Sequence, residues 1–159
     1  MSESKYNIKS ITPSGFFGDS PDNIVEIENF LTESEQQRLI NFAMTNKVWD
    51  KTIDSVDEDG LILYQASVWD DRVCTYNSLK ESDPSILELI YSMIERLKIE
   101  VESFFQVRVQ ETGPAIVKWP IGARQEPHAD KEFHIGKEKG RANEFPHYDI
   151  ASLFYFIKS

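Results

Sequence analysis

The segment from Asp83 to Phe105 constrains the fold more than any other part of the sequence. Asp83 is a favourable N-cap, and Pro84 suits the first helical position because its missing N–H would have no partner there. Apolar residues then recur at helical spacing. They are Ile86, Leu87, Ile90, Ile94, Leu97, Val101, Phe104 and Phe105. The sequence therefore predicts one long amphipathic helix that buries this stripe in a core.

Two shorter elements are predicted before this helix. In IVEIENF, Val25 and Ile27 alternate with glutamates, which is the pattern of a half-buried strand. Thr32 and Glu35 have the spacing of a capping box. A second helix is therefore expected to begin directly after this strand and to end near Asn46.

Turn-rich and β-prone stretches make up most of the remaining sequence. Residues 1–22 contain a stretch rich in Pro, Gly, Ser and Asp and are expected to form an irregular arm. The acidic stretch DSVDEDG predicts an exposed turn. LILYQASVW and RVCTYN, which come after it, have strand composition and suggest a hairpin or meander. The last segment, from Ile150 to Ile157, is apolar enough for a strand buried on both faces. Together these elements predict an α+β fold in a single domain spanning residues 1–159.

The charge balance excludes several classes of partner. Seventeen basic residues against 27 acidic ones give a formal net charge of -10, which repels nucleic acid and anionic lipid surfaces. The opening MSESKYNIKS lacks the order of a secretory signal, and no apolar run approaches the length of a membrane span, so a cytoplasmic location is expected. The single cysteine, Cys74, is flanked by Val73 and Thr75, which favours a strand position over a nucleophile.

The stretch EPHAD is the strongest candidate for chemistry. In an extended segment, the side chains of His128 and Asp130 point to the same side. Such a pair supplies two of the three ligands of the two-histidine-one-carboxylate site that binds Fe(II). The motif alone is not specific, because His147 and Asp149 have the same spacing. EPHAD is preferred because it follows a predicted strand and turn, whereas the second pair leads directly into the apolar segment.

Two alternatives remain open for the histidines. A surface imidazole bonded to a nearby carboxylate is a structural interpretation of either pair, and it is the preferred interpretation of His134. In a third arrangement, His128, Asp130 and His147 together hold zinc or iron in a shortened fold. That arrangement requires the charged loop from Lys131 to Pro146 to fold back.

Five stretches form an ordered series along the chain, from about Asn23 to the last residue. They are NIVEIENFLTESEQQRLINFA, SVWDDRV, the long helix from Asp83, IVKWPIGARQEPHAD and DIASLFYFIKS. In this order they resemble the prolyl 4-hydroxylase-like branch of the Fe(II)/2-oxoglutarate-dependent dioxygenases. The resemblance implies a double-stranded β-helix, or jelly roll, with N-terminal helices packed on one sheet.

The resemblance also implies an oxidoreductase activity. Iron would be held by His128, Asp130 and a later histidine, 2-oxoglutarate would chelate the iron, and ascorbate is a further candidate cofactor. The family hydroxylates an unactivated C–H bond, and peptidyl proline is its familiar target. Free amino acids, other peptides and nucleotides also stay open as small-molecule or peptide substrates.

Two departures from the family pattern matter. Relatives have a tyrosine shortly before the metal histidine that helps to hold 2-oxoglutarate, and the matching residue here is Trp119. Trp119 is expected either to contact the co-substrate through its indole N–H or to belong to the core. The family's distal histidine and its Lys or Arg for 2-oxoglutarate come several strands after the His-X-Asp, and neither His134 nor His147 matches that place.

This second departure leads to two expectations. The first is that the chain is the N-terminal portion of a longer dioxygenase domain, and that its open sheet edges favour self-association. The second is an alternative function, a non-catalytic jelly-roll-derived interaction module with a vestigial metal motif, because two protein ligands hold iron poorly.

Overall fold

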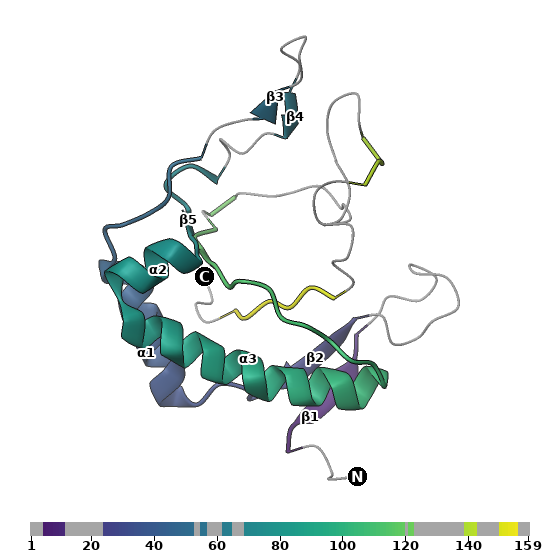
Figure 1. Ribbon diagram of the computed structural model, residues 1–159. Helices are drawn as coiled ribbons and strands as arrows, with labels where there is room; N and C mark the ends of the chain where they lie inside the picture. Colours follow the sequence, from purple (N-terminus) through teal and green to yellow (C-terminus); the bar gives the residue numbers. More distant parts are fainter. Residues whose placement is uncertain are drawn as a thin grey trace.

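The computed structural model describes residues 5–11, 24–52, 55–56, 62–64, 69–119, 121–122, 139–142 and 150–155. Three helices and three pairs of short antiparallel strands make up this part of the chain, which is an α+β structure. In chain order the elements are β1 (Asn7–Ser10), β2 (Val25–Glu28), α1 (Glu33–Thr45), β3 (Ser55–Val56), β4 (Ile62–Tyr64), β5 (Val73–Cys74), α2 (Tyr76–Ser82), α3 (Pro84–Phe105) and β6 (Ile116–Val117). The helices lie together, and the β3–β4 pair lies at the opposite end of the molecule (Figure 1).

The long helix α3 begins as its local sequence predicts. The Asp83 carboxylate accepts hydrogen bonds from the backbone N–H groups of Ser85 (3.0 Å) and Ile86 (3.2 Å), and Pro84 occupies the first turn. These bonds satisfy N–H groups that have no partner within the helix. The helix ends before Gln106, whose left-handed backbone (φ 55°) interrupts it. The prediction of one long helix over this segment is confirmed.

The strand and helix predicted before α3 are also confirmed. β2 forms within IVEIENF. At the start of α1 the Thr32 hydroxyl accepts from Glu35 N (3.2 Å), while the Glu35 carboxylate accepts from Thr32 N (2.9 Å), so the predicted capping box is complete. The helix ends at Thr45, and Asn46 is its C-cap.

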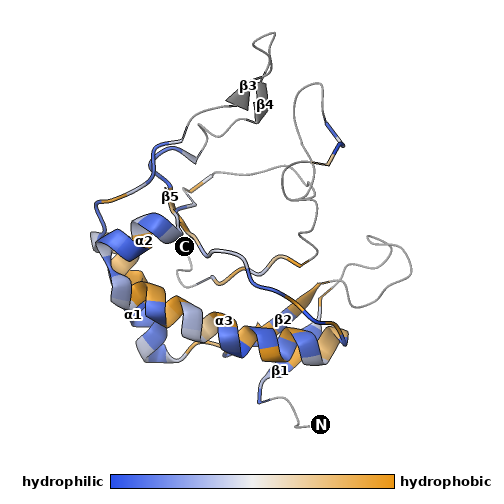
Figure 2. Ribbon diagram, viewed as in Figure 1, coloured by the Kyte–Doolittle hydropathy of each residue, from blue (hydrophilic) through white to orange (hydrophobic). Residues whose placement is uncertain are grey.

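α3 provides five of the eleven residues of the buried hydrophobic cluster, more than any other element. Hydrophobic and hydrophilic residues alternate around α1 and α3 (Figure 2). The predicted stripe is buried along the first part of the helix, while Phe104 and Phe105 at its end are half-buried. The buried cluster consists of Phe30, Leu39, Phe42, Cys74, Leu79, Ile86, Leu87, Leu89, Ile90, Met93 and Ile116. No helix in the described part of the chain is long and apolar enough to cross a bilayer.

An ion pair joins α1 to α3. The Arg96 guanidinium donates to both carboxylate oxygens of Glu35, at 2.7 and 3.1 Å, and its Cζ lies 5.2 Å from the centre of the Phe30 ring. This bidentate geometry holds the pKa of the Glu35 carboxyl below its usual range, although partial desolvation opposes the shift. Glu35 therefore stabilises both the start of α1 and its contact with α3.

The strands pair only two by two within the described residues. β1 pairs with β2, β3 with β4, and β5 with β6, all antiparallel. Strands form within both LILYQASVW and RVCTYN, but in the described residues they do not pair with each other: β4 pairs with β3, and β5 pairs with β6. Ser55 and Val56 belong to a strand rather than to the predicted turn. These three pairs, within the described residues, neither establish a double-stranded β-helix nor conflict with one.

Three expectations need correction. The irregular arm does not extend over residues 1–22, because Asn7–Ser10 forms β1 and pairs in register with β2. The stretch after Cys74 was expected to be strand, but it forms helix α2 from Tyr76. The third correction concerns the end of the chain: residues 150–155 form no strand, and most of their side chains are exposed. Among them, Phe154 reaches the core, where its ring lies 5.4 Å from that of Phe30.

Candidate functional site

Trp119 is the predicted site residue that the structure describes. His128 and Asp130 lie outside the described residues, as do the alternative ligands His134, His147 and Asp149. That His128 and Asp130 lie together as ligands of one metal ion therefore stays a prediction. The geometry around Trp119 shows what the preceding strand can contribute to a site.

The β5–β6 pair that leads to Trp119 is apolar on both faces. Cys74 lies opposite Ile116, and both are buried in the core cluster. Val73 lies opposite Val117, whose side chain points to the other face because side chains alternate along a strand. Val117 is 44% exposed. One face of this pair thus packs on the helices, and the other carries apolar side chains that are partly open.

Trp119 lies two residues beyond the end of β6, and its ring packs against that of a second tryptophan. Its indole is 50% exposed, and its ring centre lies 5.1 Å from that of Trp69 at an angle of 51°. Trp69 begins the turn that leads into β5. Such a tilted arrangement is favourable for aromatic pairs. Two segments far apart in the sequence therefore meet in one partly exposed aromatic pair.

Backbone hydrogen bonds fix the turn that carries Trp69. Arg72 N donates to Trp69 O (2.9 Å), and Asp71 N donates to Asp50 O (3.0 Å). Lys118 N donates to Arg72 O (2.8 Å), which extends the β5–β6 pairing towards Trp119. The turn is therefore tied both to the segment around Asp50 and to β6.

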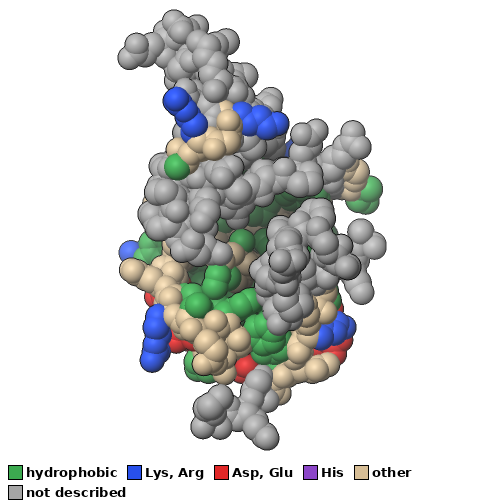
Figure 3. All heavy atoms as spheres, turned by 90° about the vertical axis from the view of Figure 1, so that its right-hand side faces the viewer, with side chains coloured by type: hydrophobic (Ala, Val, Ile, Leu, Met, Phe, Trp, Pro, Cys, Tyr) green, Lys and Arg blue, Asp and Glu red, His purple; other side chains and the backbone are tan. Residues whose placement is uncertain are grey.

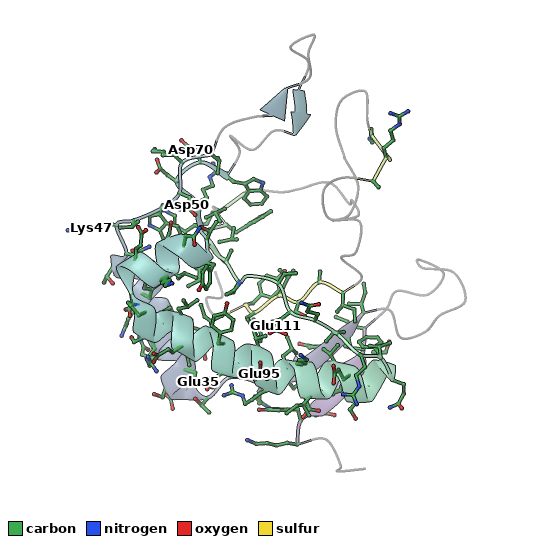
Figure 4. All side chains as sticks on the ribbon, in the orientation of Figure 1. Glu35, Lys47, Asp50, Asp70, Glu95 and Glu111 are labelled. Carbon is green, nitrogen blue, oxygen red and sulfur yellow. The ribbon has the colours of Figure 1, made fainter. Side chains whose placement is uncertain are left out.

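Asp50 and Asp70 lie near each other beside α2 and support the same turn (Figure 4). The Asp70 carboxylate accepts from Thr52 N (3.0 Å). The Asp50 carboxylate accepts from Thr75 N (2.7 Å) and from the Ser78 hydroxyl, so it caps the start of α2 from a distant part of the chain. Burial alone would raise the pKa of Asp50, but these hydrogen bonds outweigh burial and lower it. These carboxylates have structural partners.

Cys74 has the environment of a structural residue. Its side chain is fully buried in β5, so the predicted strand position is confirmed. Burial raises the pKa of the thiol, and the nearby Asp50 carboxylate raises it further. A thiol with a raised pKa is a poor nucleophile.

The third tryptophan, Trp49, packs against the core cluster. The Lys118 ammonium lies 3.8 Å from the centre of the Trp49 ring, and the Trp49 indole N–H donates to Asn46 O (3.0 Å). Sequence reasoning identified Trp119 as a site residue but not Trp69. The stretch SVWDDRV contained the relevant signal, since it places an aromatic residue just before a predicted strand.

A metal centre needs more ligands than the described residues bring together. Within the described ranges, no group of three His, Cys, Asp or Glu side chains is placed to hold a metal ion. An Fe(II) site in this chain would thus depend on His128 and Asp130, whose imidazole and carboxylate are suitable ligand types. They fit two of the three protein positions of such a site.

A shallow surface depression at the C-terminal end of α3 is a weaker candidate. It measures about 470 Å³ and is lined by Ile99, Glu102, Ser103, Gln106, Val107 and Arg108. The Glu102 carboxylate already accepts from Arg108 (3.1 Å) and from Val109 N (3.0 Å). The depression therefore lacks the convergent polar groups of an enzyme site.

Comparison with known proteins adds no relative. No protein-family model, no curated protein and no solved structure matches the chain. The functional argument therefore depends on the residues themselves.

Proposed function

We propose that this chain carries part of the active site of an Fe(II)/2-oxoglutarate-dependent oxygenase that hydroxylates an unactivated C–H bond. The observation that carries the proposal is the His-X-Asp motif at His128 and Asp130, placed after a strand and a turn. β6 supplies that strand, and Ile121 and Gly122 lie in a turn in which Gly122 has a φ of 80°. A left-handed turn of this kind favours glycine.

The two apolar faces of β5–β6 support a jelly-roll fold for this oxygenase. In a β-sandwich, an inner strand face packs against a second sheet, while the other face can be covered by helices. Cys74 and Ile116 already pack with the helices, and Val117 lies on the open face. The proposal places a second sheet on that open face.

The chain's own residues would have distinct roles. His128 and Asp130 would hold the iron together with a further histidine, and the Trp119 indole N–H would donate to 2-oxoglutarate. When bound, iron and 2-oxoglutarate would supply the chemistry of C–H hydroxylation, in which O2 is the oxidant and 2-oxoglutarate is converted to succinate and CO2. The proposed substrate is a peptide or a small molecule, with peptidyl proline as the first candidate.

Succinate formation tests this proposal. The full-length protein is incubated in air with Fe(II), ascorbate and 2-oxoglutarate, and succinate is measured. We expect succinate from the wild type and none from His128→Ala or Asp130→Ala. The matched control His134→Ala keeps its activity. If His147→Ala also abolishes activity, the arrangement with His147 as third ligand is favoured. The proposal fails if the wild type forms no succinate, or if the first two variants remain active.

A non-catalytic interaction module is the second candidate, and a specific observation favours it. Val117, Leu153 and Tyr155 each expose apolar surface, and exposed apolar surface is a feature of interaction sites. Calorimetric titration with Mn(II), a redox-inert substitute for Fe(II), separates the two candidates. Micromolar or tighter binding that His128→Ala abolishes supports the oxygenase. No binding by the wild type supports the module.

A further inference from the structure

The face of α3 opposite its buried stripe carries two acidic residues at helical spacing. Glu88 and Glu95 are seven residues apart, so they lie on the same side of the helix, about 10 Å from each other along its axis. Both side chains are exposed, and neither forms a hydrogen bond or an ion pair within the described part of the chain. Their negative charges are therefore open to a partner.

The same face ends in exposed apolar surface at the C-terminal end of α3. Ile99 follows Glu95 by one helical turn, and its large apolar side chain is 65% exposed. Val107, which is 41% exposed, lines the depression of about 470 Å³ together with Ile99. Exposed apolar surface beside charged residues is typical of a binding site for another protein.

The charges indicate which kind of partner fits this face. The chain has a formal net charge of -10, which repels a second copy or an acidic protein and attracts a basic one. Within the depression, the Glu102 carboxylate already accepts from Arg108 and from Val109 N. The depression is therefore suited to an apolar side chain, whereas Glu88 and Glu95 are suited to basic ones.

We propose that this face of α3 is a docking site for a basic amphipathic helix of another protein. Lysine or arginine side chains seven residues apart on that helix match the spacing of Glu88 and Glu95. A leucine-sized side chain one turn farther along enters the depression beside Ile99. The proposal goes beyond the oxygenase function and does not depend on it, because none of these residues belongs to the proposed metal site.

Binding of a synthetic peptide to the full chain tests this proposal. The probe is a fluorescent, alanine-rich helical peptide of about 20 residues, which is long enough to be helical in water. It carries two lysines seven residues apart and a leucine one turn after the second lysine. Fluorescence anisotropy at low salt should show that the wild type binds it with a submillimolar Kd.

The acidic part of the site is tested by removing charge without changing shape. Glu88→Gln combined with Glu95→Gln should weaken binding about two- to tenfold at low salt. The difference from the wild type should disappear in about 1 M NaCl, because salt screens exposed ion pairs. Glu33→Gln combined with Glu81→Gln is the matched control. It removes the same charge from exposed positions on α1 and α2 and should leave the Kd nearly unchanged.

The apolar part is tested by Ile99→Gln, which keeps a long side chain but removes its apolar surface. Binding should weaken about three- to tenfold. Met44→Gln, at an exposed apolar position on α1, is the control and should bind as the wild type does. The proposal is overturned if the wild type does not bind, if both pairs of Gln variants weaken binding equally, or if Ile99→Gln has no effect. Self-association of the wild type that Ile99→Gln prevents would assign this face to a second copy and would also overturn the proposal.

Discussion

Apolar residues are buried to different extents in α3 and in the β5–β6 pair. α3 buries its stripe on one side, and Met93 at its centre is 1% exposed. β6 buries Ile116 but leaves Val117, the next residue, partly exposed. Hydrophobic side chains are also visible on the face of the molecule drawn in Figure 3. The comparison teaches that α3 finds cover for its apolar stripe within the described chain, partly from Cys74 and Ile116 of the strand pair, whereas the strand pair has apolar surface on both faces and is suited to packing between two layers.

The largest expected effect on stability tests the burial of α3 in the core. Met93→Ala should lower the free energy of unfolding by about 2–5 kcal/mol, because it removes a fully buried side chain from a packed cluster. The matched control is Met44→Ala on α1, where the side chain is 75% exposed, and it should change stability by less than about 0.5 kcal/mol. Urea denaturation measures both. Similar losses in the two variants would contradict the burial of α3.

A smaller effect is expected at the ion pair between α1 and α3. Glu35→Gln keeps an oxygen for the capping box but removes the charge that pairs with Arg96. We expect a loss of about 1.5–3 kcal/mol at neutral pH, the usual range for a hydrogen bond to a charged group. Glu28→Gln is the matched control, since Glu28 pairs with Lys9 in an exposed position and solvent screens that pair.

The pH dependence of this loss follows from the lowered pKa of Glu35. Because the folded-state pKa lies below the unfolded one, the ion pair contributes fully above the ordinary Glu pKa and its contribution is lost as pH falls through the folded value. The difference between the wild type and Glu35→Gln should therefore be largest near pH 7 and shrink below about pH 4. A difference that stays constant down to strongly acidic pH would rule out the ion pair as its source.

The parts of the fold that sequence predicted correctly are those with local causes. The ends of α1 and α3 depend on caps within three residues, at Thr32 and Asp83. α2 was missed because its cap comes from Asp50, which is distant in the sequence. β1 was missed because NIKS has little strand character of its own and depends on pairing with β2.

In the candidate site, too, the sequence predicted features with local causes but not contacts between distant segments. The strand predicted before EPHAD is confirmed, since Ile116 and Val117 form β6. The contact between Trp69 and Trp119 depends on the packing of two distant segments, so no local pattern could reveal it. At the end of the chain, apolar composition predicted a buried strand, but composition does not supply a partner. Residues 150–155 form no strand, and Phe154 contacts the core. The proposed metal ligation by His128 and Asp130 stays a prediction.

The smallest expected effect on stability comes from this exposed segment. Leu153 is 76% exposed, so Leu153→Ser should change the free energy of unfolding by less than about 0.5 kcal/mol. If exposed apolar surface drives self-association, the same substitution should still reduce the weight-average mass measured by sedimentation at high protein concentration. Ser152→Ala, at the neighbouring exposed position, is the control and should leave association unchanged. A wild type that stays monomeric at every concentration would show that the exposed apolar surface of β5–β6 and of residues 150–155 does not drive self-association. The difference in apolar exposure between α3 and the strand pair would then have no consequence for association.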